Sequence, residues 1–98
     1  PIYKPFSYEW AYEAWLKQQQ VHWLPEEVPL ADDVRDWKHN LTANEKNLLT
    51  QIFRFFTQAD IEVNNCYMKH YTKVFQPTEI QMMLSAFSNM ETVHIAAY

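Results

Sequence analysis

The segment "NMETVHIAAY" at the end of the chain places three reactive side chains on one side of an expected helix. Glu91, His94 and Tyr98 follow one another at steps of three and four residues, the spacing of neighbours on a helix face. Ile80 and Leu84 continue this face as apolar positions, so we expect the face to be buried. Burying a carboxylate and an imidazole without partners costs several kcal/mol. This face of the helix is therefore either exposed to solvent, or its polar side chains bind a ligand.

An earlier segment carries a second carboxylate at a core position. Asp60 lies within an apolar stripe that advances in steps of three or four residues and is widened by two adjacent members, Ile52 and Phe53; the others are Leu49, Phe56, Val63 and Tyr67. A short connection separates this segment from the one that carries Glu91 and His94. We expect the two helices to be antiparallel neighbours, with the three polar side chains meeting at one point.

Two carboxylates and an imidazole are a plausible set of metal ligands. They suit iron or manganese better than structural zinc, which prefers thiolates. Four-helix carboxylate proteins build dinuclear sites from single acidic residues on two helices and Glu-x-x-His on two others. A bland interpretation stays open, since Glu-x-x-His arises often by chance. A lone His94 is more often a surface or satisfied core residue, and Tyr98 by itself is most often packing.

Local signals predict where the first helix and its connector lie. Ser7 is a plausible N-cap for a helix over residues 8–22, and Pro25 ends that helix. Residues 24–40 contain two prolines and five acids, so we expect an irregular connector with one short turn of helix.

Two longer helices are expected in the rest of the chain. "LTANE" has the pattern of a capping box, with Thr42 as N-cap and Glu45 three residues later. This helix is expected to continue to about Val74. Pro77 suits the first turn of the last helix, which continues to the end of the chain. The pattern predicts an all-α fold with antiparallel helices.

Composition excludes several classes of function. The chain has 98 residues and no glycine, which argues against hairpins, phosphate-binding loops and dinucleotide fingerprints. The net charge is −4 and the basic residues are scattered, so we expect no nucleic acid partner. No run approaches the roughly 20 apolar residues that a membrane span needs, and we expect no membrane association.

Cys66 is the single cysteine, which fits a reducing compartment, and we expect a cytoplasmic protein. The chain begins at Pro1 without Met and ends at Tyr98 inside a periodic helix. We therefore expect it to be a piece of a longer protein.

Four segments resemble, in order, parts of the small, radical-generating subunit of class I ribonucleotide reductase. They are "VHWLPEEV", "DWKHNLTANEKNLL", "FFTQADIEVNN" and "METVHIAAY". The resemblance implies a ferritin-like helical bundle, of which residues 1–98 would be the incomplete N-terminal part. It also implies a dinuclear metal centre, with iron favoured over manganese or a mixed pair. The partners would be a second copy of the chain and the large subunit, which reduces ribonucleotides to deoxyribonucleotides.

The resemblance also implies roles for individual residues. Asp60 matches a terminal carboxylate ligand, His94 the imidazole on the same metal, and Glu91 the carboxylate that bridges both metals. Tyr98 matches the tyrosine that is oxidised to a radical, and Trp23 matches a tryptophan that relays an electron. On sequence alone, a core aromatic beside Pro25 is the better interpretation of Trp23. The remaining ligands of the family lie beyond Tyr98, so this chain would hold half a site.

Three other functions stay open on the sequence. They are a related dinuclear-metal oxidase that binds a long-chain ligand, a ferritin-like iron store, and a metal-free helical interaction module. Trp23 and Tyr98 favour the reductase over iron storage. In the reductase we expect a dry apolar shell around the metals, formed by Phe53, Phe56 and Phe87.

Overall fold

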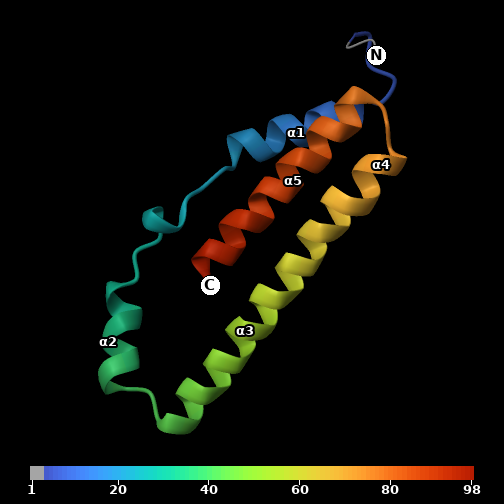
Figure 1. Cartoon of the computed structure of the whole chain (residues 1–98). Helices are drawn as coiled ribbons and strands as arrows, with labels where there is room; N and C mark the ends of the chain where they lie inside the picture. The colour runs from blue at the N-terminus through green and yellow to red at the C-terminus, as the bar shows by residue number, and fades with distance from the viewer. Residues whose placement is uncertain (1–3) are drawn as a thin grey trace.

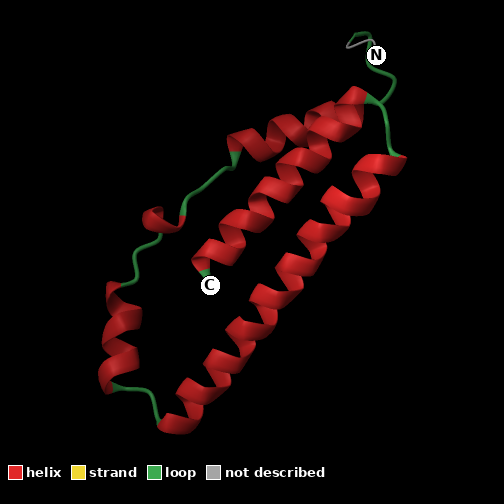
Figure 2. Cartoon of the chain, in the orientation of Figure 1, coloured by secondary structure: helices red, strands yellow, loops and turns green. Residues whose placement is uncertain are grey.

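The computed structural model describes residues 4–98, and these residues are helical with short connections (Figures 1 and 2). The elements in chain order are α1 Glu9–Gln20, η1 Pro25–Glu27, α2 Ala31–His39, α3 Ala43–Cys66, η2 Tyr67–Tyr71, α4 Thr72–Val74 and α5 Thr78–Ala97. No strand occurs within residues 4–98. The prediction of an all-α fold is confirmed.

Helix α5 lies between the other two long elements. It packs against α1 on one side and against α3 on the other, and it runs antiparallel to α3 (Figure 1). Residues 75–77 form the short turn between these antiparallel helices. The described residues form an elongated body with extents of 57 × 25 × 16 Å. The arrangement places the face of α5 that carries Glu91 and His94 within reach of α3.

The best-buried apolar cluster lies where α1 meets the first half of α5. Ala11 is fully buried, and its small side chain lets the two helices approach closely. It packs with Ile80, Met83 and Leu84, and partly buried aromatic residues of α1, η2 and α5 surround this cluster. This cluster lies near the start of α5, and buried apolar residues continue along the helix at Ala86, Met90 and Val93, the last two close in sequence to Glu91 and His94.

The start of α1 differs from the prediction. The N-cap is Tyr8 rather than Ser7, and no N-cap side chain bonds to the helix. Instead Glu79, at the start of α5, accepts hydrogen bonds from the backbone N–H groups of Ser7 (3.0 Å) and Tyr8 (2.9 Å) through Oε1. Glu79 is only 3% exposed. A buried carboxylate from another helix thus binds the backbone just before α1, but it accepts no N–H group of the first helical turn, which is the role that was assigned to Ser7.

The start of α3 follows the prediction. Thr42 Oγ1 accepts the backbone N–H of Glu45 at 3.1 Å, and Glu45 Oε1 accepts the backbone N–H of Thr42 at 2.9 Å. This reciprocal pair is a capping box. The chain stays helical to Val74 as predicted, although η2 interrupts the α-helical pattern with a π-helical turn. Pro77 lies one residue earlier than predicted, as the N-cap of α5.

The connector between Pro25 and Asn40 is more regular than predicted. The short turn of helix is present as η1, but α2 adds nine helical residues where an irregular segment was expected. Acids occupy the first turn of α2 and basic residues its last turn, which complements the helix dipole. Arg35 also pairs with Asp32 at 3.3 Å one turn away. In the sequence, these acids contributed to the prediction of an irregular connector.

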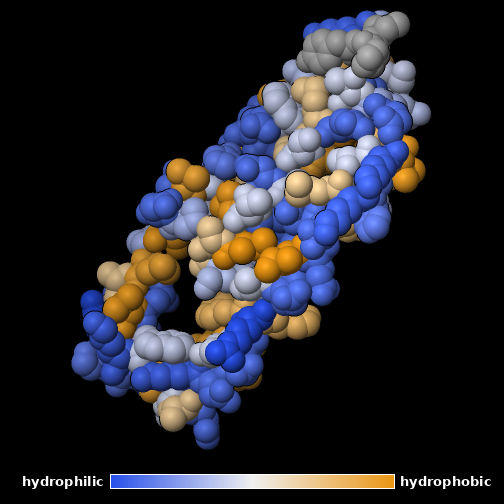
Figure 3. Space-filling model, viewed as in Figure 1, coloured by the Kyte–Doolittle hydropathy of each residue, from blue (hydrophilic) through white to orange (hydrophobic). Residues whose placement is uncertain are grey.

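The apolar stripe of α3 is only half covered. No residue of α3 is buried, and Phe53 and Phe56 are 43% and 40% exposed. Phe87 instead packs beside Tyr67 and the main core. Figure 3 shows hydrophobic groups reaching the surface in several patches on the face turned to the viewer. The dry shell that was expected from these three phenylalanines is absent from the described part of the chain.

Candidate metal centre

The structure brings Asp60, Glu91 and His94 together. Each offers one ligand atom, and these atoms lie within 4.8 Å of one another. His94 Nδ1 is 3.6 Å from Asp60 Oδ2 and 3.6 Å from Glu91 Oε2. Both distances are too long for a direct hydrogen bond. The three groups therefore surround a common point without satisfying one another, and their role as metal ligands stays a prediction.

The carboxylates of Asp60 and Glu91 are largely buried, yet each has an oxygen that lacks a hydrogen-bond partner. The side chains of Asp60 and Glu91 are 19% and 16% exposed, and His94 is 36% exposed. The atoms Asp60 Oδ2 and Glu91 Oε2 are buried and have no hydrogen-bond partner. Buried polar atoms in folded proteins nearly always have a partner, and a cation would supply one for both oxygens at once. The residues present thus fit a hard divalent cation such as iron or manganese.

The electrostatics of the site also favour a bound cation. Burial raises the pKa of Glu91, and the neighbouring Asp60 carboxylate raises it further, while His94 acts in the opposite direction. Two ionised carboxylates held close together repel each other unless a positive charge lies between them. A shared cation would reverse that repulsion, because it favours the ionised form of both acids.

Tyr98 lies next to the cluster on the α3 side. Its ring centroid is 5.6 Å from that of Phe56 and 6.4 Å from that of Phe53. Burial of the phenol raises the pKa of Tyr98, and the negative charge of Asp60 adds to the effect. The phenol is therefore neutral at physiological pH and lies near the carboxylate of Asp60.

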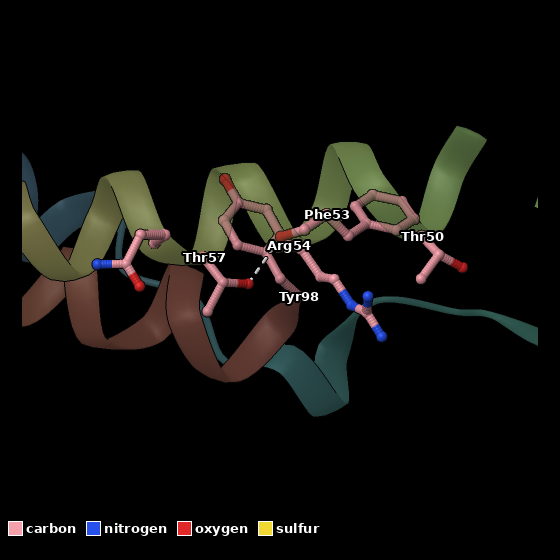
Figure 4. A pocket seen from close by; sticks show the side chains of 6 residues that line it. Thr50, Phe53, Arg54, Thr57 and Tyr98 are labelled. Atoms are coloured by element: carbon pink, nitrogen blue, oxygen red, sulfur yellow. Dashed lines mark hydrogen bonds between the residues drawn. The ribbon is translucent and has the colours of Figure 1, made fainter. Parts of the chain in front are cut away.

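Figure 4 shows Tyr98 lying across α3, in a pocket of about 510 Å³. The pocket is also lined by Thr50, Phe53, Arg54, Thr57 and Gln58. The Thr57 hydroxyl donates to the Phe53 carbonyl at 2.8 Å, so it bonds within its own helix rather than to Tyr98. Tyr98 itself is 47% exposed, so its ring is not sealed from water by residues 4–98.

Trp23 approaches the cluster from the other side. It lies between α1 and η1, and its ring centroid is 6.1 Å from that of His94, with the ring planes inclined by 32°. The turn after it is fixed by Glu27, which accepts the backbone N–H of Leu24 at 2.7 Å. The imidazole of His94 thus lies between an indole ring and two carboxylates.

Comparison with known proteins decides the family. The model of the family described as "Ribonucleotide reductase, small chain" matches residues 2–98. The chain belongs to this family. The fold of the ribonucleotide reductase small chain is a ferritin-like helical bundle and the family uses metal, so residues 4–98 form part of such a bundle.

Similar sequences carry the same family name. The chain is 49% identical over 96 residues to a probable ribonucleoside-diphosphate reductase small subunit of Invertebrate iridescent virus 6, covering 98% of this chain and 27% of that protein. A probable small subunit of Invertebrate iridescent virus 3 is 43% identical over 98% of this chain and 25% of its own length. The subunit beta of Chlamydia pneumoniae is 32% identical over 96% of this chain and 28% of its own length.

The chain thus spans about a quarter of the length of these relatives. No solved structure matches it significantly. Among the helices of residues 4–98, none is both long and apolar enough to cross a membrane.

One polar contact in this part of the ribonucleotide reductase small chain was not predicted from the sequence. Ser88 Oγ on α5 donates a hydrogen bond to Asn64 Oδ1 on α3, and the pair is partly buried. A signal was present in the sequence. Asn64 follows Asp60 by four residues and Ser88 precedes Glu91 by three, so both belong to the faces that carry the proposed ligands.

Proposed function

We propose that the protein to which residues 1–98 belong is the small subunit of a cytoplasmic ribonucleoside-diphosphate reductase. It would act as a homodimer with the large subunit, which reduces ribonucleotides to deoxyribonucleotides. The observation that carries this proposal is the meeting of Asp60, Glu91 and His94, with two unpartnered buried oxygens, in a chain of the ribonucleotide reductase family.

Asp60 and His94 would hold one metal ion, and Glu91 would bridge to a second. Residues 1–98 would form the N-terminal part of a ferritin-like dinuclear-metal domain, with the remaining ligands supplied by later helices. Iron is the metal that we propose, with manganese or a mixed pair as alternatives, because carboxylates and imidazole suit all three. When bound, the reduced metal pair supplies chemistry with oxygen that amino acid side chains cannot perform.

The aromatic residues would handle the oxidising equivalent. Tyr98 is our proposed site of the stable radical, supported by its neutral phenol and its position beside Asp60. Trp23 is our proposed electron relay, supported by its ring contact with His94. Phe53 and Phe56 stack near Tyr98 and would exclude water from it once the rest of the bundle covers them.

The test is reduction of a ribonucleoside diphosphate by the full-length protein mixed with its large subunit, after treatment with Fe²⁺ and oxygen. We expect turnover that depends on both subunits and on the metal. A protein that takes up iron and oxygen but supports no nucleotide reduction would favour the oxidase or the iron store. A protein that binds no metal would favour the interaction module.

A further inference from the structure

The contact between Asn64 and Ser88 joins the two helices that carry the proposed ligands. Among the described residues it is the one side-chain to side-chain hydrogen bond between α3 and α5. Asn64 lies one helical turn beyond Asp60, and Ser88 lies one turn before Glu91. Because α3 and α5 are antiparallel (Figure 1), these residue numbers place the bond about one helical turn from the ligand cluster along the same helix–helix contact.

Apolar packing constrains the register of α3 weakly. No residue of α3 is buried, and Val63, beside Asn64, is 40% exposed. Apolar burial is non-directional, so a small axial shift of a half-exposed stripe changes its free energy little. A hydrogen bond depends steeply on distance and angle, so it responds to the same shift strongly.

The ligand cluster itself works against close approach when no cation is present. Asp60 Oδ2 and Glu91 Oε2 are buried on facing helices without hydrogen-bond donors. Their mutual repulsion pushes α3 and α5 apart at that level. A neutral contact one turn away opposes this separation without adding charge to the site.

We propose that the hydrogen bond between Asn64 and Ser88 positions the metal ligands by fixing the register of α3 against α5. This inference rests on the proposed metal site, and it makes both residues positioning residues that do not touch the metal. Loss of a group that orients metal ligands typically lowers metal affinity about 10- to 100-fold. Asn64→Ala and Ser88→Ala should therefore weaken metal binding although every proposed ligand is intact.

The experiment is an anaerobic titration of the full-length protein with Co²⁺, followed by its visible absorption. The absorption bands report ligand geometry as well as occupancy. We expect the Co²⁺ dissociation constant to rise at least about 10-fold in Asn64→Ala and Ser88→Ala. The double variant should be no weaker than the worse single variant, because both changes remove one contact.

Matched controls separate this effect from helix propensity and from general destabilisation. Asn65→Ala and Ser85→Ala make the same chemical changes at exposed neighbouring positions and should bind Co²⁺ like the parent. Ser88→Thr keeps a hydroxyl donor and should restore much of the affinity. If Asn64→Ala does not fold, Asn64→Ser replaces it, since its shorter side chain does not reach Ser88.

Two results would overturn the proposal, and they differ. If Asn64→Ala and Ser88→Ala melt at lower temperature yet bind Co²⁺ with the parental affinity and spectrum, the contact is merely structural. If the parent itself bound no Co²⁺ at Asp60 and His94, the proposed function would fail together with this inference.

Discussion

The Nδ1 atom of His94 lies 3.6 Å from the Oδ2 atom of Asp60, although the two residues come from different helices. The distance is too long for a hydrogen bond and short enough for both atoms to contact one ion. The relationship depends on the antiparallel packing of α3 and α5, and it leads to predictions about stability, metal binding and radical chemistry.

Asp60→Asn should change stability in opposite directions with and without metal. Without metal, the change removes the negative charge that faces Glu91 and offers its unpartnered oxygen an amide donor. We expect the metal-free full-length protein to gain on the order of 1 kcal/mol, the value of an ordinary hydrogen bond. With metal, the variant should be less stable than the parent, because it binds the ion more weakly.

The measurement for Asp60→Asn is the urea midpoint in chelator and in excess Mn²⁺. Asp33→Asn, which removes an exposed acid from α2, serves as the control and should show no such reversal. A variant that is destabilised equally in both solutions would indicate that Asp60 is a structural residue.

Glu79→Ala should destabilise the protein by about 1 to 3 kcal/mol, because it leaves backbone N–H groups of Ser7 and Tyr8 without their acceptor. Glu79→Gln keeps a carbonyl oxygen at the same place and should cost less. Thermal or urea unfolding of the full-length protein measures both changes. Glu13→Ala, at an exposed position of α1, is the control, and an equal loss there would argue against this role of Glu79.

Thr42→Ala should cost about 1 kcal/mol through loss of the N-cap of α3. The urea midpoint of the full-length protein measures the effect. Asn44→Ala, at an exposed position in the first turn of α3, should be close to neutral. An unchanged midpoint in Thr42→Ala would show that the capping box contributes nothing measurable.

The capping box also predicts a pH dependence. Hydrogen bonds from the backbone and side chain of Thr42 lower the pKa of Glu45 below its ordinary value of 4.5. An acid whose pKa is lower in the folded state stabilises the protein above its unfolded-state pKa, and that contribution disappears as the pH falls through the folded-state pKa. The stability advantage of the parent over Glu45→Gln should therefore be constant near neutral pH and shrink below about pH 4.5. An advantage that grows in acid would contradict the assignment.

Tyr98→Phe should abolish the sharp organic-radical signal in the electron paramagnetic resonance spectrum recorded after Fe²⁺ and oxygen are added. The substitution keeps the ring contacts with Phe53 and Phe56 but removes the oxidisable hydroxyl. Metal loading should survive, because no proposed ligand changes. Tyr71→Phe, in η2, is the control and should retain the signal. Parental turnover in Tyr98→Phe would mean that the oxidising equivalent stays on the metals.

The sequence correctly predicted those features of the fold that depend on interactions between residues close together in the chain. The capping box located the start of α3, because Thr42 and Glu45 bond to each other across three residues. The start of α1 was predicted less well, because the backbone before it is bound by Glu79, which is remote in the sequence and adjacent only in the folded chain. Helix α2 was missed because its acids lie in the first helical turn, where they interact favourably with the helix dipole. Composition alone does not distinguish such acids from those of an irregular connector.

Some features of the candidate site could also be predicted from the sequence, and others could not. Helical spacing predicted that Asp60, Glu91 and His94 would meet. The helical repeat determines which face of its helix each side chain is on, and the short turn between the two helices makes them antiparallel neighbours. Spacing did not show that Phe53 would be exposed, because burial depends on what packs over it. No periodic pattern connects Trp23 with His94, so spacing could not show that their rings lie close together.

The most direct test of the metal site is a crystal structure of the full-length protein loaded with iron, measured at the iron absorption edge. We expect an anomalous peak at roughly 2 Å from an oxygen of Asp60, an oxygen of Glu91 and a ring nitrogen of His94. A second peak should share Glu91. Peaks elsewhere in the protein, with Asp60 and His94 bonded only to other side chains or to water, would contradict the proposed metal site.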